Sequence, residues 1–152
     1  MTTEASLKTL EALYLAIPPV AAMQPRIARY DGQRLRLHAA LSLHVNDKGC
    51  AFGGSLASLM TLAAWGLVTL KVHEAGLDAD VFVADAQVRY LAPLYADLEA
   101  EAGLAADQSW DGFIATLRAR GRARAVLRTR VPLPDGGIAT EASSRYVAIL
   151  CR

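Results

Sequence analysis

Apolar residues recur at helical spacing in three parts of the chain. Residues 4–16 and 109–120 each carry one apolar stripe with positions three and four apart, which predicts amphipathic helices. Residues 53–75 are apolar on every side, a pattern typical of a helix buried at the centre of a fold. Ser55 is placed to cap the start of this long helix, and Gly76 is placed to end it.

Alternating apolar and polar residues predict strands on both sides of the long helix. Residues 27–43 predict two strands joined by a turn at Asp31-Gly32. Further strands are predicted over residues 81–91, 98–104, 122–132 and 138–150. The short connections between the last strands favour antiparallel pairing. The whole pattern indicates one α+β domain over residues 1–152, in which an antiparallel sheet wraps around one long central helix.

Composition and charge narrow the class of protein. The 152 residues are 53% hydrophobic with a net charge of +1, which suits one globular domain and argues against a dedicated nucleic-acid binder. The uncharged run over residues 49–70 is long enough to cross a membrane, but its small residues and flanking strands favour a buried core helix. The amino-terminal residues lack the pattern of a signal peptide, and the two cysteines form no disulfide or zinc pattern. We therefore expect a cytoplasmic protein that needs no metal or cofactor.

The segment before the long helix resembles a known family. Residues 46–56, Asn-Asp-Lys-Gly-Cys-Ala-Phe-Gly-Gly-Ser-Leu, are similar to the signature of a bacterial putative-thioesterase family. Its members occur alone or as the C-terminal half of some GNAT-type acetyltransferases. The similarity continues in Trp65-Gly66 and in residues 84–93, Ala-Asp-Ala-Gln-Val-Arg-Tyr-Leu-Ala-Pro. The resemblance implies a hotdog fold, a dimer or a dimer of dimers, and acyl-thioester chemistry at the boundary between subunits.

The chain departs from the usual hotdog thioesterase pattern. The better-characterised enzymes often carry a His-Gly-Gly element and a carboxylate one or two turns into the central helix. Here Phe52 precedes the two glycines, and Met60 and Thr61 occupy the region of that carboxylate. Members of the resembled family often carry Asn at the position of His44 and Thr at the position of Cys50. The resemblance therefore implies thioesterase chemistry with an incomplete catalytic pattern.

The glycine pair at the predicted helix start is suited to stabilising the negative charge that develops on a thioester carbonyl during hydrolysis. The first backbone N–H groups of a helix have no partner inside it and lie at its positive end. Glycines allow the carbonyl to approach these groups closely. We predict that Gly54 polarises the carbonyl and that Phe52, Gly53 and Ser55 contact the substrate. The alternative is that the glycines only permit tight packing of the helix against the sheet.

Hydrolysis also needs a group that activates water, and three polar residues are candidates. The family resemblance implies that the strand carrying Asp85 lies at the subunit edge, where Asp85 would serve as general base. The alternative is a structural ion pair with an arginine such as Arg89. Asp47 is a second candidate base, and Asn46 is a candidate for positioning water or the carbonyl. Both of these loop residues also suit a turn, in which Asn and Asp bond their own backbone.

Two further features have simpler explanations. Cys50 precedes the helix start, a position that can activate a thiol, but an inert loop thiol is the favoured interpretation. Arginines at alternate positions of residues 122–130 suit the phosphates of coenzyme A. Cross-strand ion pairs with the acidic residues at 97–101 explain most of them without a ligand.

The sequence thus predicts an acyl-CoA thioesterase that works as a homodimer or a dimer of dimers, with its site shared between subunits. The substrate would be an acyl thioester of coenzyme A or of acyl carrier protein. The alternative is a non-catalytic acyl-thioester binding module, which keeps the helix-start donors and lacks a competent base. Neither a nucleic acid nor a membrane is expected as a partner. A hotdog dehydratase is disfavoured because its histidine and helix carboxylate are not in the expected places.

Overall fold

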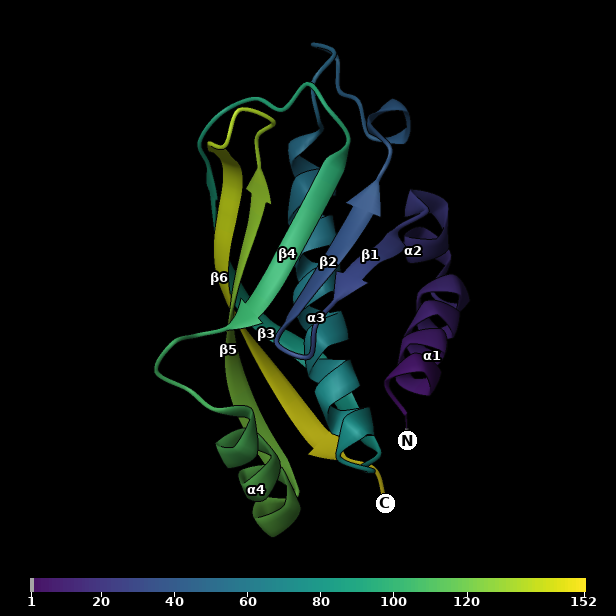
Figure 1. Cartoon of the computed structure of the whole chain (residues 1–152), viewed down its shortest axis with the longest axis vertical. Helices are drawn as coiled ribbons and strands as arrows, with labels where there is room; N and C mark the ends of the chain where they lie inside the picture. Colours follow the sequence, from purple (N-terminus) through teal and green to yellow (C-terminus); the bar gives the residue numbers. More distant parts are fainter. Residues whose placement is uncertain (1) are drawn as a thin grey trace.

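A six-stranded sheet curves around one long helix in the computed structural model of the protein, which describes residues 2–152 (Figure 1). The long helix is α3 (Gly53–Glu74). The strands are β1 (Arg26–Tyr30), β2 (Arg34–Ala39), β3 (Ala79–Tyr90), β4 (Leu98–Leu104), β5 (Arg122–Pro132) and β6 (Ile138–Leu150). They lie in the order β1-β2-β4-β5-β6-β3, and every neighbouring pair is antiparallel. The predicted α+β class, antiparallel sheet and central helix are confirmed.

Three shorter helices flank this core. They are α1 (Thr3–Ala16), α2 (Pro18–Met23) and α4 (Trp110–Arg120). In α1, the buried Tyr14 hydroxyl donates a hydrogen bond of 2.7 Å to the Leu62 carbonyl, which ties this helix to α3. α4 begins after Ser109, whose hydroxyl accepts a hydrogen bond from the N–H of Gly112 at 3.0 Å. This cap satisfies one of the free donors of the first turn.

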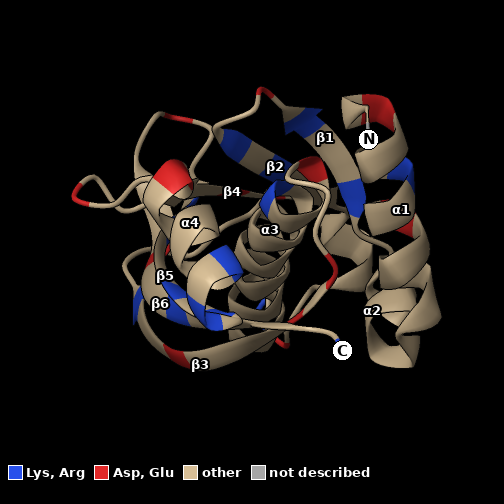
Figure 2. Cartoon of the chain, turned by 90° about the horizontal axis from the view of Figure 1, so that it is seen from below, with Lys and Arg blue, Asp and Glu red and all other residues tan. Residues whose placement is uncertain are grey.

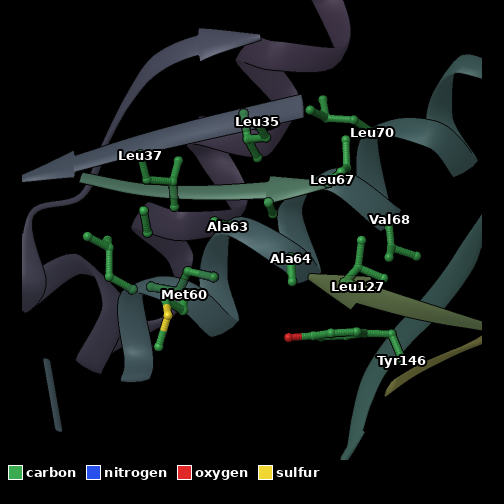
Figure 3. Close-up of a cluster of buried hydrophobic side chains, with 14 of the residues drawn as sticks. Leu35, Leu37, Met60, Ala63, Ala64, Leu67, Val68, Leu70, Leu127 and Tyr146 are labelled. Carbon is green, nitrogen blue, oxygen red and sulfur yellow. The ribbon is translucent and has the colours of Figure 1, made fainter. Parts of the chain in front are cut away.

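The central helix supplies most of the core because it is apolar on every side. Twelve of its 22 residues are buried, and charged residues occur on it only toward its C-terminal end (Figure 2). Figure 3 shows side chains of β2, β5 and β6 gathered around α3, with Leu127 and Tyr146 close to Ala64. The window of α3 that is apolar enough to cross a membrane is 61% buried inside the fold. The uncharged run therefore forms a core helix, as its composition predicts.

The second predicted strand is shorter than expected. β2 ends at Ala39, and Leu41–Leu43 form a short 3-10 helix, η1. The N–H of Leu41 donates to the Asp97 carboxylate at 2.9 Å, and the N–H of His44 donates to the Leu41 carbonyl at 2.8 Å. Local hydrogen bonds thus replace the strand partners that the alternating pattern led us to expect.

β3 forms one edge of the sheet and, within the part of the chain that the structure describes, pairs with β6 alone. A bulge at Ala84 interrupts this pairing, so that Val83 lies opposite Tyr146 and Asp85 lies opposite Arg145. Residues directly opposite each other in antiparallel strands project from the same face. Tyr146 is buried against α3, whereas Arg145 is exposed on the outer face. Asp85 therefore lies on the face of the sheet that points away from the central helix.

Candidate active site at the start of the central helix

Three consecutive backbone N–H groups are free at the start of α3. Within residues 2–152, no hydrogen bond is made by the N–H of Gly53, Gly54 or Ser55, and the first bonded N–H is that of Leu56. Phe52 is the residue before the helix and provides no side-chain cap. The prediction that Ser55 caps the helix is wrong, because Ser55 is already its third residue. The helix start thus presents unpaired donors at the positive end of the helix dipole.

Two aromatic rings border these donors and occupy the space that larger residues would fill. A Cβ atom on Gly54 would lie 2.5 Å from Cε2 of Phe52, and one on Gly53 would lie 3.3 Å from Cε1 of Tyr90. The Tyr90 hydroxyl also donates to the Gly53 carbonyl at 3.1 Å, which joins β3 to the helix start. Phe52 is 55% exposed and Tyr90 is 57% exposed. The glycine pair therefore leaves the donors open between two rings that are themselves accessible.

Ser55 forms a hydrogen-bonded pair with His44. Its Oγ lies 2.8 Å from Nδ1 of His44, and Nε2 of the same ring lies 2.8 Å from the backbone oxygen of Met23. A carbonyl oxygen can only accept, so in the neutral ring Nε2 carries the proton and Nδ1 is left as an acceptor. The Ser55 hydroxyl consequently donates to Nδ1. His44 is 5% exposed, so its ring is largely buried, whereas Ser55 is partly exposed.

The Ser55–His44 pair forms because residues 45–51 fold back as a closed loop. Val45 and Ala51 form an isolated antiparallel bridge, and the N–H of Phe52 donates to the His44 carbonyl at 2.7 Å. The loop thereby places His44 beside a residue 11 positions later in the chain. The sequence predicts substrate contact for Ser55 but no link to His44. The available signals were a serine in the first helical turn and a histidine at the other end of a turn-forming loop.

Asn46 and Asp47 lie in this loop, and their side chains have partners there. The Asn46 Oδ1 accepts from the N–H groups of Lys48 at 2.8 Å and Cys50 at 3.2 Å. The Asp47 carboxylate is exposed and lies 2.9 Å from Nζ of Lys48. The contacts of Asn46 are the turn chemistry weighed as its alternative role, whereas Asp47 makes a side-chain ion pair with its neighbour in the chain. Cys50 is a buried free thiol, and the Asn46 amide donates to its Sγ at 3.3 Å.

Asp85 is held by a different arginine from the one suggested by its sequence neighbourhood. Both of its carboxylate oxygens lie 2.9 Å from Nε of Arg145, and Nη2 of that arginine also donates to one of them. The Arg145 guanidinium lowers the pKa of the Asp85 carboxyl. Arg89 pairs instead with Glu141, at 3.4 Å. Asp85 and the start of α3 therefore lie on opposite faces of the sheet within one chain, and the sequence-based grouping of Asp85 with Gly54 is not formed inside the protomer.

The arginines of β5 form a basic stripe on the outer face of the sheet, and fewer of them have an acidic partner than predicted. Of the β5 arginines in the described residues, only Arg130 has an acidic partner, Glu101 at 3.6 Å. Glu101 is shared with Arg34 and Arg36 of β2. An open hollow of about 940 Å³ lies over this face and includes Arg128 in its lining. No residue of 52–55 lines this hollow, so it does not coincide with the free donors at the start of α3.

The architecture is the hotdog fold of the thioesterases, a curved antiparallel sheet around one long helix. Residues 7–150 match the sequence profile described as "Putative thioesterase (yiiD_Cterm)", so the chain belongs to this family. A protein of unknown function from Chlorobaculum tepidum TLS is similar, with 26% identity, a TM-score of 0.92, and 99% of this chain and 98% of that chain covered. A putative thioesterase from Shewanella oneidensis matches with 27% identity, a TM-score of 0.85, and 96% and 99% of the two chains covered. A probable thioesterase from Pseudomonas aeruginosa shares the fold at 20% identity, with a TM-score of 0.79 over 99% and 97% of the chains.

Proposed function

We propose that this protein hydrolyses acyl-coenzyme A thioesters at the start of α3. The observation that carries the proposal is the run of three free N–H groups at Gly53, Gly54 and Ser55. Membership of a thioesterase family supports thioester chemistry. During hydrolysis the carbonyl oxygen becomes negatively charged, and it would accept hydrogen bonds from Gly54 and one of its neighbours. Removal of one such donor in other enzymes costs about 10²–10³ in rate.

Apolar side chains near the helix start are suited to the acyl group. Leu43, Val45 and Phe52 come from the segment that leads into α3, and each is about half exposed. Tyr90 lies on the other side of the glycines. Exposed apolar surface of this kind gains free energy when an acyl chain covers it, at about 25 cal/mol per Å². The free N–H groups therefore suit the thioester carbonyl, and the apolar side chains around them suit the acyl chain.

A second copy of the chain would complete this site along β3. The outer edge of this strand has no partner within residues 2–152, and exposed large apolar residues lie along it, Phe82, Val83, Tyr90 and the adjacent Leu91. An open edge of this length favours pairing with another strand. Pairing of β3 with its copy would continue the sheet and bring the partner next to Tyr90 and the helix start. We therefore propose a cytoplasmic homodimer with sites at the subunit boundary.

A non-catalytic acyl-thioester binding module is the second candidate. Within residues 2–152, no carboxylate forms a hydrogen bond to Gly53, Gly54 or Ser55, while Asp85 pairs with Arg145 and Asp47 with Lys48. Such a module would bind the carbonyl without a group that activates water. Water activation by Asp85 or Asp47, assisted by Asn46, remains a prediction from the sequence that substitution of each residue tests.

Thiol release from a panel of acyl-CoA esters, from acetyl to palmitoyl with phenylacetyl and benzoyl, tests the hydrolase. The wild type is expected to release thiol. Gly54→Val is expected to lose at least about 10²-fold in kcat/KM, since its side chain would collide with the Phe52 ring beside the donors. Circular dichroism checks that the variant is folded. Saturable binding of acyl-CoA by calorimetry without any thiol release would contradict the hydrolase and support the binding module.

A further inference from the structure

We propose that Ser55 is a covalent nucleophile and that His44 is its base, so that hydrolysis passes through an acyl-serine. The inference rests on the proposed function and specifies its chemical route. A serine hydroxyl is a weak nucleophile unless an adjacent base removes its proton. The structure supplies that base at hydrogen-bond distance, since Ser55 Oγ lies 2.8 Å from Nδ1 of His44.

The second contact of His44 prepares the ring for this role. The Met23 carbonyl, 2.8 Å from Nε2, fixes the tautomer in which Nδ1 is free to accept a proton. When Nδ1 becomes protonated, the ring is positively charged and the Met23 oxygen stabilises the Nε2–H. The Ser55 hydroxyl, the His44 ring and the Met23 carbonyl are thus hydrogen-bonded in series as nucleophile, base and orienting group. Activated nucleophiles in general have this arrangement. The His44 ring is buried and hydrogen-bonded at both nitrogens, which holds it in this orientation.

The position of Ser55 places its hydroxyl next to the free donors. The backbone N–H of Ser55 belongs to the same run as those of Gly53 and Gly54. A carbonyl under attack by Oγ would have its oxygen close to this run, where the developing charge is stabilised. The pair also removes the need for a carboxylate at the helix start, which is the group that the described residues do not place there. Ser55 is partly exposed, as access by a substrate requires.

The two half-reactions balance without an added reactant. In the first, Ser55 Oγ forms a bond to the thioester carbon, the carbon–sulfur bond breaks, and the hydroxyl proton passes through His44 Nδ1 to the leaving thiolate. In the second, a water oxygen bonds to the same carbon while its proton moves to Nδ1. The bond from Oγ to carbon then breaks, and Nδ1 returns the proton to Oγ. The products are a free thiol and a carboxylic acid.

Trapping of the acyl-enzyme tests the proposal directly. Wild type mixed with equimolar acyl-CoA and quenched in acid is expected to gain the mass of one acyl group in place of one hydrogen, on the peptide containing Ser55. Ser55→Ala and His44→Asn are expected to form no adduct and to lose at least about 10²-fold in turnover. The double variant is expected to lose no more than either single variant, because the two side chains act as a unit. Ser42→Ala, an exposed serine two residues before His44, is the matched control and is expected to keep adduct and turnover.

A fluorophosphonate probe covers the case in which deacylation is too fast for an adduct to accumulate. Phosphonylation breaks the phosphorus–fluorine bond and leaves a stable label, which is expected on Ser55 of the wild type and reduced at least about tenfold in His44→Asn. Turnover that survives Ser55→Ala would overturn the proposal and leave the hydrolase in place. Turnover lost in Ser55→Ala with neither adduct nor label would also overturn it, because Ser55 would then only position water. No turnover in the wild type would refute the proposed function, and the label alone would then decide whether Ser55 and His44 form an activated pair.

Discussion

Gly66, in the middle of α3, is a position where a single methyl group is expected to weaken the fold. A Cβ atom on Gly66 would overlap the Tyr14 hydroxyl and would lie 2.9 Å from a methyl carbon of Leu35. Both neighbours are buried, with exposed fractions of 3% and 0%, so neither has space to withdraw. The Tyr14 hydroxyl is also committed to the Leu62 carbonyl at 2.7 Å. Gly66→Ala should therefore disturb the packing between α1, α3 and β2 together.

Three contributions set the expected change in the free energy of unfolding of Gly66→Ala. Overpacking of a filled core costs about 1–3 kcal/mol, and loss of the Tyr14 hydrogen bond costs about 0.5–1.5 kcal/mol. Replacement of a helical glycine by alanine returns about 1 kcal/mol. The net expected loss is about 0.5–3.5 kcal/mol in the free energy of unfolding. For a domain of this size, each kcal/mol lowers Tm by about 2–4 °C.

Urea unfolding followed by circular dichroism at one fixed protein concentration measures this loss, since an oligomer would make stability concentration-dependent. Tyr14→Phe provides the matched test of mechanism, because it removes the atom that the new methyl group overlaps. The double variant should cost less than the sum of the two single variants, by about 0.5 kcal/mol or more. A Gly66→Ala variant as stable as the wild type would refute the packing argument.

Two further predictions concern ionisable groups. The acyl-serine route predicts that Asp85→Asn keeps turnover within about threefold, measured by thiol release, because that route does not use Asp85, whose partner is Arg145 on the outer face. A loss of about 10²-fold would instead establish Asp85 as the base that the sequence predicts. Burial, with a smaller contribution from Tyr146, raises the pKa of Tyr14 above its usual value of 10.0. Above that pH the unfolded chain loses the Tyr14 proton while the folded chain keeps it, so stability is full below pH 10 and falls as the pH rises. The decline in urea midpoint above this pH should be shallower in Tyr14→Phe, and equal slopes would contradict the assignment.

The fold could be predicted from the sequence because its apolar and alternating patterns extend over long segments. The uncharged run that ends at Leu70 could be buried only as the centre of a fold or in a membrane, and α3 is that central helix. Gly76 ends the helix region as predicted, with a φ of 73° that favours glycine. The error at Leu41–Leu43 arose where alternation continued past the end of β2. A short apolar alternation fits a 3-10 turn equally well when a side chain such as Asp97 supplies the hydrogen bond.

The candidate site could be predicted from the sequence only in part, because it depends on geometry that the sequence does not show. The helix start was predictable because two glycines before an apolar run mark both a helix terminus and an open backbone. The face on which Asp85 lies was not predictable, because one bulged residue, Ala84, reverses the alternation along β3. The contact of Ser55 with His44 depends on the closure of a loop, and loop closure brings together residues whose sequence separation carries no signal of its own.

The most direct test of the account is the kcat/KM of Gly54→Ala measured in the Phe52→Ala background, relative to Phe52→Ala alone. Removal of the Phe52 ring eliminates the nearest atom that the new Cβ would meet, at 2.5 Å, so that distortion of the helix start is minimised. Any remaining loss then reports obstruction of the carbonyl by a methyl group beside the free N–H groups. The account predicts a further loss of at least about tenfold in thiol release with the fold unchanged by circular dichroism. Equal activity of the single and double variants would contradict the claim that the thioester is hydrolysed at the start of α3.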